Sequence, residues 1–153
     1  MFKTMKKRIK NEKGLTLIEL LAVIVILAIV AAIAVPAIGN IIDNSRYNAV
    51  KADGINVLNA ANIYYTDNSD AADNVTVQTL INEKYLDAAG KIPTEATISK
   101  DVPRKLTTDS ITNAVGSKSV TFASVTIDDI NKDNKKGSED GDKTISPVTS
   151  GTP

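Results

Sequence analysis

One carboxylate stands at the start of a long apolar run near the N-terminus of this sequence. Residues 20–38 contain no charged and no polar side chain, and Glu19 directly precedes them, four residues after the apolar Leu15. An ionised group in hydrocarbon costs about 2.5–3.5 kcal/mol on insertion scales, so an acid at this depth is a functional candidate by default. The alternative is that Glu19 lies near enough to the membrane interface to reach water.

A second set of oxygen-bearing side chains lies near the C-terminus. Asp129, Asn131 and Asp133 stand at a spacing of two, and Asp140 is the twelfth residue counted from Asp129. Oxygen ligands at the first, third, fifth and twelfth positions are typical of a calcium loop. The sixth position, normally glycine, is Asn134, and nearby lysines dilute the negative field. The sequence therefore leaves two alternatives, a Ca²⁺ site and a solvated acidic loop, and Ca²⁺ is the one cofactor that it suggests.

The composition argues against other chemistry. The 153 residues include no histidine and no cysteine, which removes the commonest general base, the commonest zinc ligand and all thiol chemistry. No serine or lysine stands in a recognisable nucleophile motif, so we predict that the protein is not an enzyme. The 18 basic and 18 acidic residues balance, but residues 1–14 are basic and the remainder is therefore acidic. An acidic region of this kind lacks the excess of basic residues that is typical of a nucleic-acid-binding protein.

The elements that position Glu19 follow from the apolar run. An uncharged run of this length is typical of a membrane-spanning helix, which we place at residues 15–39. Residues 1–14 form a basic leader, and the positive-inside rule places them in the cytoplasm and everything after Pro36 outside. The alternative is an ordinary secretory signal, cleaved after the Ala-Ile-Ala of residues 32–34. The apolar region is long for such a signal, and it contains Glu19.

The helix is expected to continue beyond the membrane as an amphipathic half over residues 40–65. Pro36 lacks an N–H for the preceding turn, so we predict a kink there, loosened further by Gly39. Apolar residues then recur at spacings of three and four and form one stripe. The stripe consists of Tyr47, Val50, Gly54, Val57, Leu58, Ala61, Tyr64 and Tyr65.

Residues 66–153 are predicted to form a globular region that covers this stripe. Thr76 can cap a short helix that ends near Asp87. Short β-favouring runs follow at residues 96–98, 110–112 and 119–127, the last with a bulge near Ala123. A small antiparallel sheet packed across the helix would bury both apolar faces, which makes the fold class α+β. The tail from Ser146 is predicted to be a loose end or an edge segment.

The junction between leader and helix resembles that of type IV pilins and pseudopilins. Residues 13–19, Lys-Gly-Leu-Thr-Leu-Ile-Glu, match the family pattern of glycine before the cut and glutamate at the fifth mature position. The resemblance covers about residues 6–65, includes a match for the kinking proline, and departs in having leucine where the first mature residue is usually phenylalanine. It implies removal of the leader by a prepilin peptidase between Gly14 and Leu15, N-methylation of Leu15, and a role for Glu19 in assembly register.

The resemblance implies a structural subunit of a type IV pilus with a type IV pilin-like fold. Its precursor would sit in the cytoplasmic membrane and then polymerise, with copies of itself, into a helical surface filament for adhesion, motility or DNA uptake. An assembly ATPase and a polytopic platform protein are the implied partners. Two alternatives stay open: a pseudopilin of a type II secretion or competence system, and a single-pass membrane anchor for an extracellular binding module. In the anchor, Glu19 would be dispensable.

Overall fold

The long N-terminal helix is confirmed. The structure is a computed structural model that describes residues 16–148, and helix α2 (Leu17–Asp67) passes through Pro36 without ending. The chain divides into two compact units between Gly39 and Asn40. Helix α2 contributes residues to both units. We call the described part of the second unit, residues 40–148, the head.

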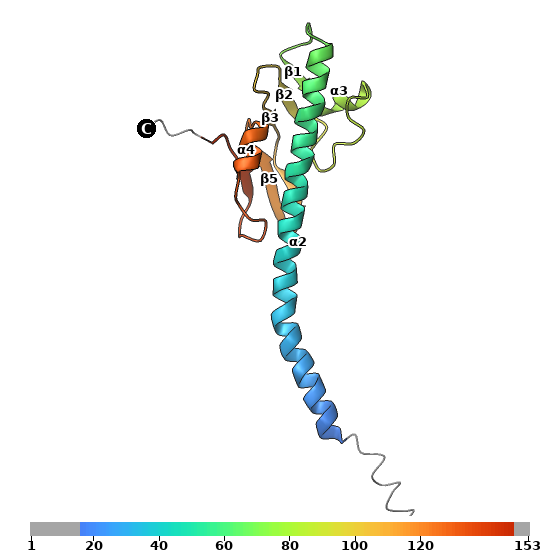
Figure 1. Ribbon diagram of the computed structural model, residues 1–153, viewed down its shortest axis with the longest axis vertical. Helices are drawn as coiled ribbons and strands as arrows, with labels where there is room; N and C mark the ends of the chain where they lie inside the picture. The colour runs from blue at the N-terminus through green and yellow to red at the C-terminus, as the bar shows by residue number, and fades with distance from the viewer. Residues whose placement is uncertain (1–15, 149–153) are drawn as a thin grey trace, which may run out of the picture. The chain divides into compact units, whose positions relative to one another are not determined.

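The head contains every other element of the described chain (Figure 1). It also contains all of the buried core among the described residues. The elements are β1 (Asn74–Thr76), α3 (Val77–Asn82), β2 (Thr97–Ser99), β3 (Leu106–Thr107), β4 (Ile111–Val115), β5 (Lys118–Phe122), α4 (Ile127–Lys132) and β6 (Lys143–Ile145). The expected α+β class, a long helix packed on small sheets, is confirmed.

The core is organised around the predicted stripe of α2. Its buried residues are Tyr47, Val50, Gly54, Val57, Leu58, Ala60, Ala61 and Tyr65, whereas Tyr64 is only partly buried. Gly54 allows the helix to approach the strands closely, because a Cβ there would lie 2.8 Å from the ring of Phe122. Phe122 itself is fully buried, as are Val120 and Ile145. The helix and the strands thus bury each other's apolar faces.

The prediction of one antiparallel sheet was wrong in detail. The structure has two three-stranded sheets, ordered β1-β2-β3 and β4-β5-β6. The first is antiparallel throughout, whereas β5 and β6 pair in parallel. The sheets meet where Leu106 and Val125 exchange both backbone hydrogen bonds, at 2.8 and 3.0 Å. Val125 is fully buried, so the segment after β5 still contributes to the core.

The predicted strand over residues 119–127 is shorter than expected. β5 ends at Phe122, and Ser124 takes a left-handed backbone conformation with φ of 57°. This break lies at the predicted bulge, but the chain then turns into α4 instead of resuming the strand. Thr126 ends the extended conformation because its hydroxyl accepts a hydrogen bond from the Asp129 N–H at 3.2 Å.

Helix α3 starts where the sequence predicts and stops earlier. The Thr76 hydroxyl accepts a hydrogen bond from the Thr79 N–H at 3.2 Å and forms the predicted cap. The helix ends at Asn82 rather than near Asp87, because Lys84 adopts a left-handed conformation with φ of 63°. The Tyr85 N–H then donates to the Leu80 carbonyl at 2.9 Å, which closes a Schellman motif without glycine.

Helix α4 was missed by the sequence prediction, which placed a loop there. Asp129 completes a capping box, since its Oδ2 accepts from the Thr126 N–H at 2.9 Å and from the Thr126 hydroxyl at 2.8 Å. Its Oδ1 accepts from the Val148 N–H at 2.8 Å. Burial by itself raises the pKa of Asp129, but the hydrogen bonds from Thr126 and Val148, together with nearby Lys132, outweigh it and hold the pKa below its ordinary value.

We expect Asp129→Asn to lower the free energy of unfolding by about 1 kcal/mol at neutral pH, the typical cost of a lost cap. The pKa of the wild-type carboxyl is lower in the folded than in the unfolded chain, so its contribution is present above an unfolded-state pKa of about 3.9. That contribution is lost as the pH falls through the folded-state pKa, so the variant should show a flatter acid dependence. Urea unfolding followed by circular dichroism from about pH 2 to pH 7 measures both effects.

Asp128→Asn is the matched control for this prediction. Asp128 lies in the same helix and pairs with Lys132 at 2.6 Å, but its side chain is 69% exposed. An exposed pair of this kind contributes about 0.5 kcal/mol or less. Equal losses in the two variants would contradict the role assigned to Asp129.

Candidate functional site

The apolar part of α2 in the first unit carries no core of its own. No residue from 17 to 39 is buried, and the large hydrophobic side chains of this stretch are exposed on every side of the helix. By length and composition α2 can cross a membrane, and none of its most apolar stretch is covered by the rest of the protein. A helix that is apolar all round requires lipid or other protein around it.

Glu19 lies in the first turn of this apolar helix. Thr16 is the N-cap, since its carbonyl accepts hydrogen bonds from the Glu19 N–H at 2.8 Å and the Leu20 N–H at 3.3 Å. The Glu19 carboxylate reaches back, and its Oε2 accepts from the Thr16 N–H at 3.0 Å. This is half of a capping box, at a helix end that favours negative charge. The Thr-x-x-Glu spacing of residues 16–19 is the sequence signal of such a cap.

The other residues predicted for processing and helix shape have different positions. Gly14 and Leu15, the predicted cleavage and methylation site, lie outside the described residues. Pro36 stands within α2, and a Cβ at Gly39 would meet nothing within 4 Å. Gly39 therefore lies on open helix surface. The kink predicted at these two residues stays a prediction.

The acidic residues of the second candidate site are bonded to different parts of the head. Asp133 Oδ2 accepts a hydrogen bond from the Tyr47 hydroxyl at 2.8 Å and lies 3.4 Å from Lys51 Nζ, so it joins the end of α4 to α2. Lys51 Nζ also donates to the Asp133 carbonyl at 2.6 Å. Burial, and then the hydrogen bond to Asp133, raise the pKa of Tyr47 far above its ordinary value, which keeps the hydroxyl protonated as a donor.

The structure does not gather the four residues predicted to hold calcium. Asp129 caps α4, Asn131 is exposed, and Asp140 contributes its backbone carbonyl to Lys143. Over residues 16–148, no three acidic side chains form a group that could hold a metal ion. Calcium binding by Asp129, Asn131, Asp133 and Asp140 stays a prediction, and a measurement that decides it is described below.

Comparison with known proteins finds a recognised motif at the N-terminal site. A family model described as the prokaryotic N-terminal methylation motif matches residues 9–35, and this motif is the type IV pilin and prepilin signature. The matched stretch includes Gly14, Leu15 and Glu19 together with most of the apolar helix. No curated protein and no solved structure gives a significant match to the chain.

Proposed function

From the premise that the chain is a type IV pilin-like precursor, we propose that it is the structural subunit of a type IV pilus. The precursor is held in the cytoplasmic membrane, cut between Gly14 and Leu15, methylated on the new Leu15 amine and polymerised into a helical surface filament. The observation that carries the proposal is the apolar stretch of α2, residues 17–39, which has no buried residue and most of which lies within the methylation motif.

The proposal gives the apolar helix two successive environments. In the precursor, lipid surrounds its apolar surface, and the helix bonds its backbone groups within itself except near its first turn and at the Ala32 carbonyl, which loses its donor at Pro36. In a filament, the same surface packs against the helices of neighbouring copies. The head keeps its own core from Tyr47 onward, so it folds against α2 without using the surface of residues 17–39.

Glu19 acquires a charged partner when the leader is removed. The cut creates a positive amine at Leu15, close along the chain to Glu19, and a neighbouring copy presents the same two charges. At about 4 Å and an effective dielectric constant of about 20, such a pair gains about 4 kcal/mol before desolvation. Desolvation offsets much of this gain, so the pair sets the register between subunits more than it adds strength.

The proposal requires partners that act on the precursor. A prepilin peptidase cuts and methylates it on the cytoplasmic side, where the positive-inside rule places the basic leader. An assembly ATPase and a polytopic platform protein supply the energy and the membrane site for polymerisation, since the sequence contains no nucleotide-binding motif.

Intact mass of the protein from membranes or sheared filaments tests the processing step. We expect a mature chain that begins at methylated Leu15. Replacing Gly14 with leucine should leave nearly all of the chain as precursor, because the peptidase has to approach the backbone closely at a residue without a side chain. Gly39→Leu is the control, since Gly39 follows the matched motif and should leave cleavage unchanged. A mature chain beginning at Val35 would instead support an ordinary secretory signal.

A further inference from the structure

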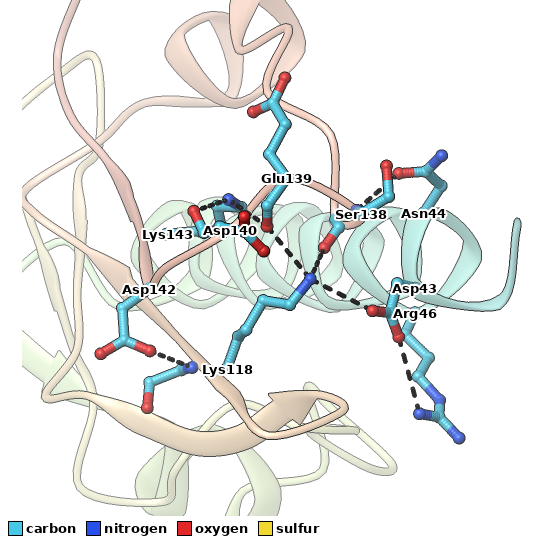
Figure 2. Close-up of polar contacts among 11 residues, drawn as sticks. Asp43, Asn44, Arg46, Lys118, Ser138, Glu139, Asp140, Asp142 and Lys143 are labelled. Atoms are coloured by element: carbon cyan, nitrogen blue, oxygen red, sulfur yellow. Dashed lines mark hydrogen bonds and ion pairs between the residues drawn. The ribbon is translucent and has the colours of Figure 1, made fainter. Parts of the chain in front are cut away.

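Lys118 holds a loop of the head by its ammonium group. Lys118 Nζ lies 3.2 Å from Asp43 Oδ2, 2.5 Å from the Gly137 carbonyl oxygen and 3.1 Å from the Glu139 carbonyl oxygen (Figure 2). An ammonium group has three N–H donors, and these three oxygens account for all of them. The side chain is 17% exposed. A charge held partly out of water is stabilised by oxygens of this kind around it.

A second ammonium group contacts the same loop. Lys143 is 5% exposed, and its Nζ donates to the Glu139 carbonyl at 2.9 Å and to the Asp140 carbonyl at 3.1 Å (Figure 2). The two lysines therefore share the Glu139 carbonyl. The sheet explains their proximity, because Val120 pairs with Lys143 and residues two apart in a strand, such as Lys118 and Val120, share a face.

The loop is also bonded at both ends to regular structure. The Ser138 N–H donates to Asn44 Oδ1 at 2.9 Å, and the Ser119 N–H donates to Asp142 Oδ1 at 2.7 Å (Figure 2). Its backbone carbonyls at 137, 139 and 140 converge on positive charge, which is how protein loops surround a hard cation. Without a cation between them, these aligned oxygens would repel one another.

We propose that residues 137–142 form a cation-binding loop whose resident cation is the ammonium group of Lys118. The site is completed by the Asp43 carboxylate of α2, and it becomes a divalent-cation site, with Ca²⁺ as the probe ion, when the lysine ammonium is removed. The inference does not depend on the function proposed above. It assigns the loop a cation that is part of the chain, so the head holds this loop on α2 whatever the calcium concentration outside the cell.

The distances set the strength expected of such a site. The oxygens lie 2.5–3.2 Å from Lys118 Nζ, whereas Ca²⁺ binds oxygen at about 2.3–2.6 Å, so the loop has to contract slightly. Two carbonyls and one carboxylate are few ligands, and water completes the shell. Lys143 and Arg46, whose guanidinium lies 3.9 Å from Asp43 Oδ1, both oppose a divalent cation. We therefore expect a dissociation constant of about 10⁻⁴–10⁻³ M, the range of weak extracellular calcium modules.

The first arm of the test removes the ammonium and keeps the side-chain volume. The full-length chain is purified in detergent and melted under circular dichroism. Lys118→Met should lower the melting temperature by about 5–10 °C, because the loop carbonyls and Asp43 lose their cation. Lys136→Met is the matched control, because the Lys136 side chain is exposed and forms no hydrogen bond or ion pair with the described residues. Equal melting temperatures for wild type and Lys118→Met would overturn the proposal.

The second arm adds calcium at millimolar concentration, with sodium chloride of matched ionic strength as the salt control. The wild type should show no shift, whereas Lys118→Ala should gain about 2–4 °C through binding to the folded state. Adding Asp43→Asn to Lys118→Ala should remove that gain. If Lys118→Ala does not fold, Lys118→Ser, which also leaves room for an ion and water, is refolded with and without calcium.

The outcomes separate two hypotheses. Absence of a calcium response in both Lys118→Ala and Lys118→Ser would overturn the proposal of a cation-binding loop. A calcium response in the wild type would also overturn it, and would favour the calcium site predicted at Asp129, Asn131, Asp133 and Asp140, particularly if Asp129→Ala with Asp133→Ala abolished the response.

Discussion

Cells that produce Glu19→Val in place of the wild-type chain are expected to make no filaments while keeping a cleaved protein in the membrane. In a filament, valine leaves the Leu15 amine of a neighbouring copy unpaired among apolar helices. Losing one partner of a buried ion pair costs about 3–5 kcal/mol, and the cost recurs at every subunit. Membrane insertion should be neutral or slightly improved, because the helix loses a charge. The measurement is the yield of sheared filaments against the amount of cleaved membrane protein.

The hydrogen bond from Thr16 to Glu19 supplies the control for this experiment. Glutamine at position 19 can still accept from the Thr16 N–H, as glutamate does at 3.0 Å, but it carries no charge. If charge pairing drives assembly, Glu19→Gln should fail to form filaments as Glu19→Val does. Filaments from Gln but not from Val would assign Glu19 to the helix cap alone.

The same experiment compares the remaining functional hypotheses. Normal filament yield from Glu19→Val would remove the assembly role and favour a single-pass anchor. Long sheared filaments from the wild type support a pilus subunit, whereas short polymers retained at the envelope would favour a pseudopilin.

Gly137→Val is expected to cause the largest loss of stability in the head. A Cβ at Gly137 would lie 2.1 Å from the Asp43 carbonyl oxygen and 2.8 Å from the Tyr47 Cβ. The first of these atoms is helix backbone, so the loop has to leave α2, and the contacts of Gly137 with Lys118 and of Ser138 with Asn44 are lost. We expect a loss of about 3–5 kcal/mol in the free energy of unfolding, measured by urea denaturation in detergent.

Gly141→Ala is the control for this steric argument. Gly141 has a φ of 81°, but a Cβ there would meet nothing within 4 Å. Alanine should therefore cost only about 1–2 kcal/mol, the penalty of a left-handed conformation. If Gly137→Val lost less stability than Gly141→Ala, the close contact between loop and helix would not hold in solution.

The parts of the fold that the sequence predicts are those with a strong periodic or capping signal. The apolar run and the stripe from Tyr47 to Tyr65 predict α2, because each pattern extends over several turns. Thr76 predicts the start of α3 through a side chain known to cap helices. The end of α3 carries no comparable signal, since lysine stands where glycine normally allows the left-handed conformation.

The region after β5 shows why the rest could not be predicted. Asp129 and Asp133 have the spacing of cation ligands, but the same Asp129 stands three residues after Thr126 and completes a capping box. Which pattern applies depends on Val148, Tyr47 and other partners distant in sequence. β6 gives no strand signal of its own, because its three residues are specified by pairing with β5. In the N-terminal site, the Thr16 cap does have a sequence signal, which is the spacing of three residues between Thr16 and Glu19.

The parallel pairing of β6 with β5 constrains when the head can fold during synthesis. Ile145 of β6 is fully buried, so the core is complete only when nearly the last described residues have left the ribosome. The apolar helix has no such dependence, since its hydrogen bonds join residues only a turn apart and need no later part of the chain. If the precursor is held in the membrane as proposed, the chain is tethered there before its head closes. A chain arrested before Lys143 would lack β6 and leave the apolar face of β5 uncovered.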